Sequence, residues 1–404
     1  MKYINKIFSI DGVSSIKLAK KFDTPIYCYS QNSIKENILN LKKNFSKFNP
    51  LICFSVKSNS NLYLLREIKK LGCGADVVSM GELIKALKAG MRPEKIVFSG
   101  VGKTSKEISY AVSRKILLIN IESKSEVLKI EKIAKLKKKI VNIGIRLNPN
   151  IDAKTLSQIS TGKKVNKFGI EEDDIYKVIK IIQKSKYLNL NCLSVHIGSQ
   201  ILDYKPYLKM LKILNRIIDK SKHHFKFIDL GGGMGISYDE KIKRLNYAKY
   251  SKEIYKFYKK HKSKIIFEPG RSIIGNAGVL ISKITYVKET NSKNFIILDA
   301  GMNDLMRPAL YGSKHKILPA IKKNISLRKN IEFVGPICET TDSFLFLKKF
   351  QKLNENDVVI IRDVGAYGMS LSSNYNLRPK PIEVLIKKNK IIIIKKREKI
   401  LDII

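Results

Sequence analysis

A lysine at the end of an apolar run is the first residue in this sequence that could do covalent chemistry. Lys57 follows LICFSV and precedes SNSN, so its amine is expected to emerge at the end of a buried strand. An amine held among apolar residues and other cations loses its proton more readily and can form a Schiff base with an aldehyde cofactor. In a chain with 78 lysines and arginines, a single strand-end lysine is usually a surface residue. The interpretation of Lys57 as a Schiff-base lysine therefore depends on other segments of the sequence.

Three such segments follow other expected strands. IDLGGGMG contains three consecutive glycines, Gly231, Gly232 and Gly233, whose bare backbone can approach a phosphate. Its spacing fits neither the dinucleotide nor the P-loop motif, and a tight turn is the plain alternative. FEPGR places Glu268 where a carboxylate could pair with a pyridine nitrogen. HIGSQ offers a ring for stacking and a hydroxyl for phosphate, although an isolated histidine is more often structural.

The elements that must position these residues alternate along the chain. From residue 33 to 276, short apolar runs such as PLICFSV and IVNIGIRLN alternate with amphipathic stretches such as LYLLREIKKLG. This pattern predicts a parallel sheet with crossover helices. Eight such units close into a TIM barrel, whose active site lies at the carboxyl ends of the strands.

The pattern changes after residue 277 to strands without long helices, for example VLISKITYVKE and DVVIIRDVG. This change predicts an antiparallel β domain. We therefore expect a barrel domain over 33–276 and a β domain built from 1–32 and 277–404.

A formal net charge of +43 is the most unusual property of the composition, and it suggests a nucleic-acid partner. The lysines are spread along the whole chain between apolar residues, which favours solvated faces and a compositional bias, and we expect no nucleic-acid partner. The five cysteines are far apart and form no C-x-x-C pair, which fits a reducing cytoplasm. We expect no metal site, secretion signal or membrane span.

The order FSVKSNSN, HIGSQ, DLGGGMGI and FEPGR resembles that of the alanine-racemase-like decarboxylases, which are pyridoxal-phosphate-dependent enzymes of fold type III. The resemblance implies a (β/α)8 barrel followed by an antiparallel β-barrel or sandwich domain. It makes Lys57 the Schiff-base lysine, His196 the ring-stacking residue and Glu268 the partner of the pyridine nitrogen. The other cofactor-binding residues that it implies are Asp76, Arg146, Ser199, Gly231, Gly232, Gly233, Pro269, Gly270, Arg271 and Tyr367.

Three segments of the β domain narrow the resemblance to one group within that family. LDAGMNDLMRPALYG, GPICETTDSF and DVGAYGMSLSSNYNLRP are similar to those of the diaminopimelate decarboxylases in that family. This implies decarboxylation of meso-2,6-diaminopimelate at its D-centre, through an aldimine with the cofactor, to L-lysine and CO2, the last step of lysine biosynthesis. The implied substrate-binding residues are Arg271, Arg307, Tyr311, Glu339 and Tyr367.

The same resemblance makes Cys338 the acid that protonates the carbanion, acting in the barrel of a neighbouring subunit, and so implies a homodimer with shared sites. The plain alternative for Cys338 is a buried structural cysteine. One departure from the family pattern is Gln158, which stands where a histidine is expected and leaves the loop over the substrate undetermined.

Other activities compete with this interpretation. A sibling decarboxylase acting on ornithine, arginine or a carboxylated polyamine would share Lys57 and the glycine loop, but its substrate has no distal carboxylate for Arg307 to bind. An alanine racemase would use a tyrosine of the facing subunit as second base and would not need CETTD. A protein that binds the cofactor without turnover would not need Cys338 and Glu339, and a nucleic-acid-binding protein would show strongly salt-dependent binding.

Overall fold

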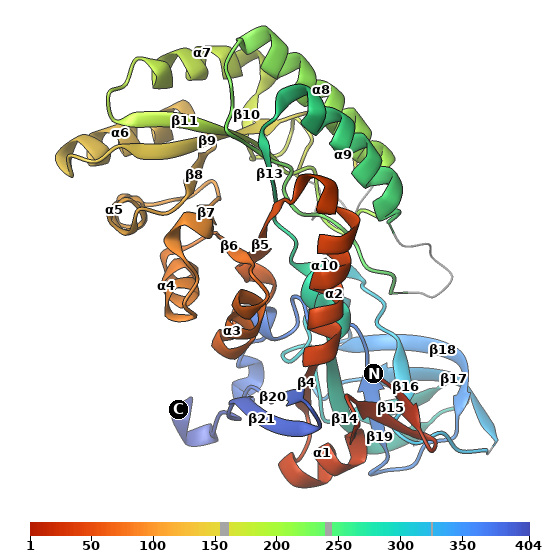
Figure 1. The fold of residues 1–404 in the computed structure, drawn as a ribbon. Coiled ribbons are helices and arrows are strands. Elements are labelled where there is room, and N and C mark those ends of the chain that lie inside the picture. The colour runs from red at the N-terminus through yellow and green to blue at the C-terminus, as the bar shows by residue number, and fades with distance from the viewer. Residues whose placement is uncertain (154–160, 239–244, 325) are drawn as a thin grey trace. The chain divides into compact units, whose positions relative to one another are not determined.

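The computed structural model describes residues 1–153, 161–238, 245–324 and 326–404. These residues form two units (Figure 1). One unit contains the described residues of 38–237 and 243–272, and the other contains those of 1–37, Tyr238 and 273–404. No helix among the described residues is long and apolar enough to cross a membrane.

The first of these units is built on a closed barrel of parallel strands. The ring runs β5-β6-β7-β8-β9-β11-β12-β13, and it closes because β13 also pairs with β5. The prediction of a (β/α)8 barrel is confirmed. Its strands are β5 (Leu51–Ser55), β6 (Gly74–Val77), β7 (Ile96–Phe98), β8 (Leu118–Ile121), β9 (Val141–Asn148), β11 (Leu188–Val195), β12 (Phe227–Asp229) and β13 (Lys264–Phe267), and a short β10 (Ile170–Glu171) pairs with β9.

Helices alternate with these strands and lie outside them (Figure 1). Several helices begin at a side chain that accepts a backbone N–H, as expected for N-caps: Ser79, Thr104 and Ser123 do so. The helices are α2 (Gln31–Asn44), α3 (Leu62–Lys70), α4 (Met80–Lys88), α5 (Ser105–Arg114), α6 (Lys124–Leu136), α7 (Glu172–Gln183), α8 (Lys205–Ser221) and α9 (Tyr247–His261).

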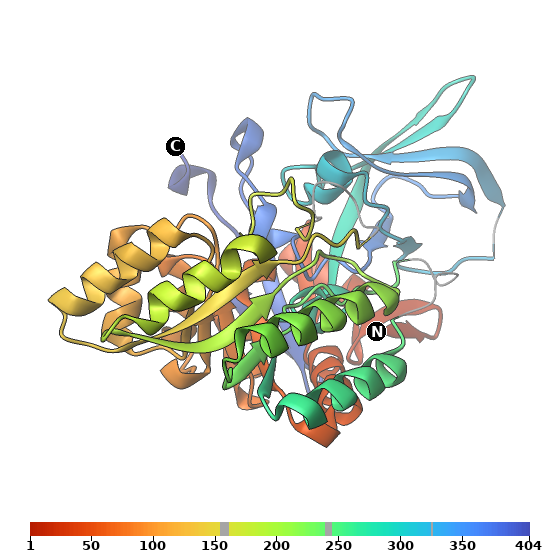
Figure 2. The same cartoon turned by 90° about the horizontal axis from the view of Figure 1, so that it is seen from above.

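Burial explains why the barrel strands are continuous apolar runs rather than alternating ones. Every residue of β5 and β8 is buried, because helices cover one face of the sheet and the barrel interior covers the other. In Figure 2 the two longest strands of the barrel, β9 and β11, run side by side. Part of the barrel interior is a cluster formed by Leu51, Cys53, Val97, Leu118, Cys192, Phe227 and Ile266.

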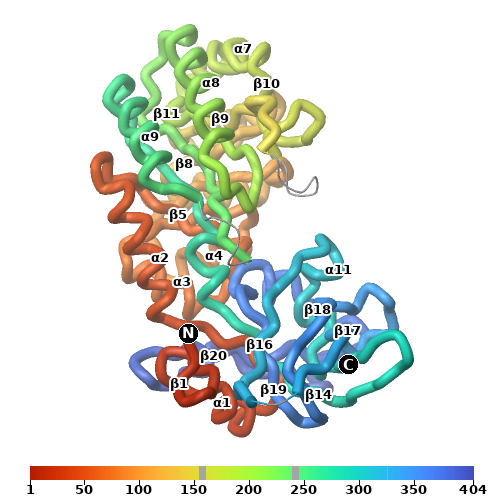
Figure 3. The backbone as a smooth tube through the Cα atoms, turned by 90° about the vertical axis from the view of Figure 1, so that its right-hand side faces the viewer, coloured from red at the N-terminus to blue at the C-terminus, as the bar shows by residue number. Residues whose placement is uncertain are grey.

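The second unit is a β domain whose main sheet has the order β18-β17-β15-β14-β4-β20-β21, with β19 joining β14 to β16 (Figure 3). Its strands are β4 (Ile26–Ser30), β14 (Gly278–Glu289), β15 (Asn294–Leu298), β16 (Ile317–Pro319), β17 (Leu327–Val334), β18 (Ser343–Gln351), β19 (Val358–Ile361), β20 (Ile382–Lys387) and β21 (Lys390–Lys395). A small sheet of β1 (Lys2–Ile4), β2 (Ile7–Ile10) and β3 (Val13–Ser14) precedes α1 (Ser15–Phe22).

Most pairings of the β domain are antiparallel, as predicted, but β4 pairs in parallel with β20 and β15 pairs in parallel with β17. Parallel neighbours require a crossover rather than a hairpin. The connection between β15 and β17 contains α11 (Arg307–Tyr311) and β16, while β4 comes from the N-terminal segment. The unit therefore combines distant parts of the sequence around one core, in which Ile26, Val279, Ile360 and Val384 are buried together.

Candidate active site

Lys57 lies in a single 3-10 turn, Val56–Ser58, directly after β5. Its amine is 3.6 Å from Oδ2 of Asp76, the third residue of β6, and the two side chains are 40% and 1% exposed. The same oxygen of Asp76 accepts a hydrogen bond of 2.8 Å from Ser55. Oδ1 of Asp76 is buried and has no hydrogen-bond partner among the described residues. Adjacent strands thus present an amine beside a fixed acid.

Glu268 follows β13 and is buried, as is Asp229 at the end of β12. A hydrogen bond joins their carboxyl groups. Burial first, and then the charges of Asp229 and Asp76, raise the pKa of Glu268 well above its usual value. Glu268 therefore holds a proton under conditions in which an exposed glutamate has lost it.

His196 directly follows β11 and carries a neutral ring. Burial first, and then the charges of Lys57 and Arg146, lower the pKa of His196 well below its usual value. The Nδ1 atom of this ring accepts a hydrogen bond of 3.1 Å from the backbone N–H of Gly232. The proton of the neutral ring is therefore on Nε2, and an uncharged flat ring is available for stacking.

Close packing is one reason why the loop after β12 is rich in glycines. A Cβ at Gly231 would lie 2.5 Å from the carbonyl oxygen of Val195, and one at Gly232 would lie 2.2 Å from that of Glu268. A Cβ at Gly233, whose φ is +84°, would lie 2.3 Å from the carbonyl oxygen of Gly198. The bare backbone thus allows the loops after neighbouring strands to meet, and phosphate binding by these glycines stays a prediction.

Arg146, in β9, is held by an acid that sequence reasoning did not identify. Its guanidinium is 2.9 Å from Oε1 of Glu122, and both side chains are buried. The Glu122 carboxylate also accepts the backbone N–H groups of Gly100 and Gly169, each at 3.0 Å. Glu122 therefore fixes Arg146 together with two loops.

The remaining predicted residues of the barrel unit lie around the start of α10 (Arg271–Ile274). Arg271 donates a hydrogen bond of 3.3 Å to Oγ of Ser199. Pro269 accepts the backbone N–H of Ser55, and a Cβ at Gly270 would lie 2.9 Å from the Ser58 side chain. The structure therefore brings Ser199 and Arg271 together, and it packs the loop that contains Pro269 and Gly270 against the end of β5.

The β domain contains four of the five predicted substrate-binding residues, and the fifth, Arg271, lies in the barrel unit. Arg307 opens α11, is buried, and donates to the Tyr238 hydroxyl at 2.9 Å and to Ser313 Oγ at 3.2 Å. Its guanidinium also lies 2.8 Å from Nε2 of His315 and over the Tyr238 ring. Tyr311 ends the same helix. Neighbouring side chains thus fix the Arg307 guanidinium in orientation.

Cys338 and Glu339 are exposed on a loop after β17 that is organised by Asp342. The buried Asp342 carboxylate accepts the backbone N–H groups of Ile337, at 2.8 Å, and Met302, at 2.7 Å. Glu339 accepts hydrogen bonds from the hydroxyls of Tyr375, at 2.5 Å, and Thr341, at 3.1 Å.

Tyr367 has a φ of +59°, a conformation that is uncommon for a residue with a side chain. Gln158, which departs from the family pattern, lies outside the described residues. No group of three or more histidine, cysteine or acidic side chains in the described part of the chain could hold a metal ion.

Sequence reasoning missed Asp229, Asn120, Glu122 and Asp342. Asp229 and Asn120 are polar residues inside the apolar runs FKFIDL and ILLINI, and both are buried. A polar residue inside a fully buried strand is a usable signal, because it needs a partner in the interior.

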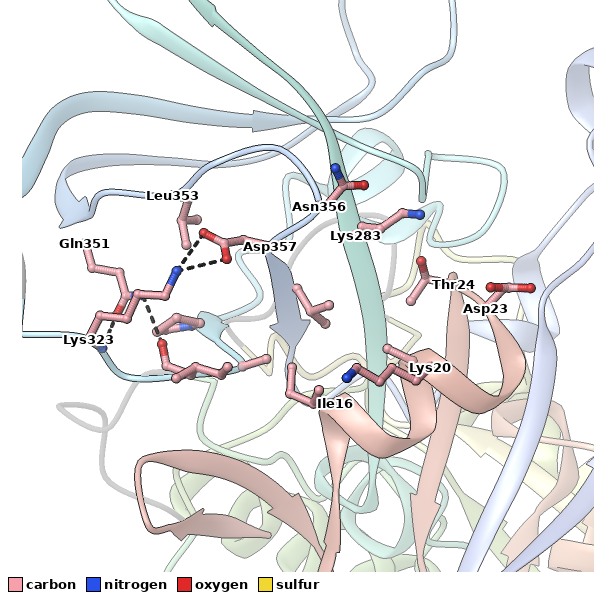
Figure 4. Close-up of a pocket in the computed structure, with 15 residues that line it drawn as sticks. Ile16, Lys20, Asp23, Thr24, Lys283, Lys323, Gln351, Leu353, Asn356 and Asp357 are labelled. Carbon is pink, nitrogen blue, oxygen red and sulfur yellow. Dashed lines mark hydrogen bonds and ion pairs between the residues drawn. The ribbon is translucent and has the colours of Figure 1, made fainter.

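A separate hollow of about 480 Å³ lies in the β domain, bordered by α1, β16 and β19 (Figure 4). Its polar lining includes Lys20, Lys283 and Lys323, and Lys323 pairs with Asp357 at 2.9 Å. None of the site residues predicted from the sequence lines it, so it is distinct from the candidate site.

Comparison with known proteins places the chain in a family. The model of the pyridoxal-dependent decarboxylases, for their pyridoxal-binding domain, matches residues 31–275. A diaminopimelate decarboxylase of Aquifex aeolicus is 41% identical over 98% of this chain and 95% of its own. One from Helicobacter pylori strain J99 is 43% identical over 96% of each chain.

Solved structures agree. Diaminopimelate decarboxylase from Helicobacter pylori, in complex with L-lysine, superposes with a TM-score of 0.91 at 42% identity and covers 96% of this chain and 98% of its own. The enzyme from M. jannaschii, also with L-lysine, has a TM-score of 0.94 at 35% identity and covers 100% and 96%. Fold and site thus define a pyridoxal-dependent decarboxylase. The chain belongs to the diaminopimelate decarboxylase family.

The residues of the barrel fit pyridoxal phosphate. The amine of Lys57 is the group that would hold the aldehyde, and the buried Asp76 beside it keeps one oxygen without a partner among the described residues. The neutral His196 ring suits stacking on an aromatic ring. The protonated Glu268 carboxyl group suits a pyridine nitrogen, which is a base. Together these groups match the aldehyde, ring and nitrogen of the cofactor.

Proposed function

We propose that this chain decarboxylates meso-2,6-diaminopimelate at its D-centre and releases L-lysine and CO2, the last step of lysine biosynthesis. The observation that carries the proposal is the match over nearly the whole chain to diaminopimelate decarboxylases, two of which are solved with L-lysine. The Lys57, Asp76, His196 and Glu268 arrangement supports it from the chemistry of the site.

When bound, pyridoxal phosphate supplies the electron sink that accepts the electrons left by the departing carboxylate. Lys57 would hold the cofactor through its amine. Glu268 would supply hydrogen bonding and charge at the ring nitrogen, and His196 would stack on the ring. Arg146, Ser199, Arg271, Tyr367 and the glycine loop would complete the binding of the cofactor and its phosphate.

Substrate recognition is assigned mainly to the β domain, with Arg271 contributed by a barrel unit. Arg307, with Arg271 and Tyr311, would bind the distal carboxylate, because a guanidinium grips a carboxylate through two parallel hydrogen bonds. Glu339 would bind the distal ammonium. Together they would orient the D-centre, whose carboxylate is the one lost. Ornithine and arginine lack the distal carboxylate and would leave Arg307 without its ligand.

We further propose a homodimer in which the β domain of one subunit completes the barrel site of the other, where Cys338 would protonate the carbon after loss of CO2. The exposure of Cys338 and Glu339 supports a role outside their own unit. We place the enzyme in the cytoplasm, which is supported by five cysteines that are all free thiols.

The test is to supply purified protein and pyridoxal phosphate with meso-diaminopimelate, L-ornithine and L-arginine in separate reactions, and to measure CO2 and the amine products. Chiral separation of the lysine identifies which centre reacted. L-lysine from diaminopimelate alone is the expected result. D-lysine would contradict the D-centre assignment, and turnover of ornithine or arginine would contradict the substrate assignment.

A further inference from the structure

We propose that Asp229 is a positioning residue for Glu268: its carboxylate accepts the Glu268 proton in a hydrogen bond and sets the charge that Glu268 presents to the cofactor ring. The inference rests on the proposed function, because Glu268 is the residue assigned to the ring nitrogen. Asp229 itself is assigned no contact with substrate or cofactor.

The hydrogen bonds around Asp229 mark it as the charged member of the pair. Oδ1 accepts the backbone N–H of Gly231 at 2.9 Å. Oδ2 accepts the Ser194 hydroxyl at 3.2 Å and the Asn120 amide at 3.3 Å. Three donors from neighbouring segments therefore bind this fully buried carboxylate, and they lower the free-energy cost of ionising it in the interior.

Glu268 has a poorer set of donors. Among the described residues, the one side chain that donates to its carboxyl group is Ser99, whose hydroxyl lies at 3.4 Å. Of two coupled carboxyl groups, the one with fewer donors keeps the proton. Glu268 therefore donates to Asp229, and one proton is shared by the pair.

Asn120 connects the hydrogen bonds around Glu268 with those around Asp229. Its amide nitrogen lies within hydrogen-bonding distance of Ser99, at 3.2 Å, and of Ser194, at 3.3 Å, as well as of Asp229. Space for the Asn120 side chain depends on Gly144 in β9, where a Cβ would lie 2.0 Å from Oδ1 of Asn120. Residues of several barrel strands therefore contribute to the position of Asp229.

Other titratable groups near the pair also change the pKa values of its two carboxyl groups. The charge of Asp76 raises the pKa of both carboxyl groups, whereas the charge of Lys57 lowers that of Glu268. Burial raises the pKa of the Cys53 and Cys192 thiols well above the usual value, so they stay neutral. Among the described residues, the titratable groups that interact with the pair include Asp76, Lys57, Cys53 and Cys192.

The two carboxyl groups of Glu268 and Asp229 share one proton. In the protein alone, the proton is on Glu268 and the charge is on Asp229. Toward the ring nitrogen of a bound pyridoxal phosphate, Glu268 would donate this proton, its O–H bond breaking as an N–H bond forms, and Glu268 would remain as a carboxylate beside the ring. The negative charge of Asp229 favours retention of that proton by the ring and Glu268 together.

The test compares Asp229→Asn with the unchanged protein by infrared spectroscopy of the full-length chain, with and without pyridoxal phosphate, as a function of pH. Asparagine keeps an oxygen for the Gly231 N–H but removes the charge. Glu268→Gln assigns the carbonyl band of the protonated Glu268. In the cofactor-free chain, Asp229→Asn should lower the pH at which this band disappears by about 1–3 units, the effect of one close charge.

Ser99→Ala provides a variant of opposite sign. It removes a donor to Glu268, so the band should persist to higher pH. Asp304→Asn is the matched control, because Asp304 is a buried aspartate of the β domain whose pKa burial raises to about 7. It should leave the Glu268 band unchanged. An Asp229→Asn chain that titrates like the unchanged protein would overturn the proposal, as would shifts of the same sign in Asp229→Asn and Ser99→Ala.

Kinetics of the loaded enzyme give the second measurement. Asp229→Asn should lower kcat by about 10–100-fold, the usual cost of losing a group that supports a direct ligand, with KM for meso-diaminopimelate changed little. Failure of the unchanged protein to bind pyridoxal phosphate would overturn the proposed function, while the infrared titration of the cofactor-free chain would still decide the carboxyl pair.

Discussion

The amine of Lys57 lies 3.6 Å from the carboxylate of Asp76, and the two residues differ sharply in how they are held. Asp76 is 1% exposed and is bound by the Ser55 hydroxyl, whereas 40% of the Lys57 side chain is exposed. A rigid acid therefore orients an amine that has room to move. This is the arrangement that a lysine needs if it must both hold a cofactor and release it during turnover.

Arg307→Lys should raise KM for meso-diaminopimelate by about tenfold or more, equivalent to roughly 1.4 kcal/mol. A lysine keeps the charge but cannot reproduce the planar fork that contacts Tyr238, His315 and Ser313. Steady-state kinetics measure the effect. Arg216→Lys, which alters an exposed pair with Glu172, is the control. An unchanged KM would remove Arg307 from substrate binding.

Gly335→Ala should lower activity by about 10–100-fold without weakening the binding of pyridoxal phosphate. The added Cβ would lie 2.3 Å from Oδ2 of Asp342, the carboxylate that organises the loop of Cys338 and Glu339. Gly102→Ala is the control, because nothing lies within 4 Å of its Cβ. Absorbance titration gives the cofactor affinity and lysine release gives the activity. Full activity in Gly335→Ala would show that the loop geometry is not needed.

His196 should make the protein less stable in acid. Its pKa is depressed in the folded state, so below about pH 6.5 the unfolded chain binds a proton at this site that the folded chain does not. The free energy of unfolding should fall by up to about 1.4 kcal/mol per pH unit from this residue as the pH decreases. Denaturant unfolding of His196→Gln should show a shallower acid dependence, whereas His224→Gln, at an exposed histidine, should retain the original slope.

The buried ion pair of Lys103 and Glu126 provides a prediction about stability. The two charged atoms are 2.7 Å apart and the side chains are 1% and 9% exposed. Lys103→Met should destabilise the chain by about 3–5 kcal/mol, because it leaves a buried carboxylate without its cation.

Adding Glu126→Gln to Lys103→Met should recover much of that loss. The glutamine is neutral and keeps an oxygen for the backbone N–H of Glu122, which Glu126 accepts at 2.8 Å. Chemical denaturation of the single and double variants completes the cycle. A double variant as unstable as Lys103→Met would show that the unpaired charge is not the cause.

Much of the fold was predictable because the barrel strands are buried on both faces and appear as apolar runs. The strand β6 was not recognised, since Gly74, Ala75 and Asp76 form no such run. A Cβ at Gly74 would lie 1.9 Å from the carbonyl oxygen of Lys95, so close packing rather than hydrophobicity explains this glycine. The strand β18 was also missed, because exposed lysines interrupt its apolar residues.

The chemical groups of the site were predictable from motifs, but their supporting residues were not. Asp229 and Glu122 owe their roles to Glu268 and Arg146, which lie 39 and 24 residues further along the chain and become neighbours only when β12 pairs with β13 and β8 pairs with β9. Likewise, the parallel pairing of β4 with β20 joins segments from opposite ends of the chain. Local patterns do not specify such pairings.

Identification of the residue that carries the cofactor, made together with an assay of the product, tests the central claim most directly. The protein is loaded with pyridoxal phosphate, reduced with borohydride and mapped by peptide mass, while an unreduced portion is assayed for L-lysine from meso-diaminopimelate. We predict the label on Lys57, and a loss of turnover by roughly 10³-fold or more in both Lys57→Ala and Lys57→Arg. A label on another lysine, or turnover that survives in these variants, would contradict the account.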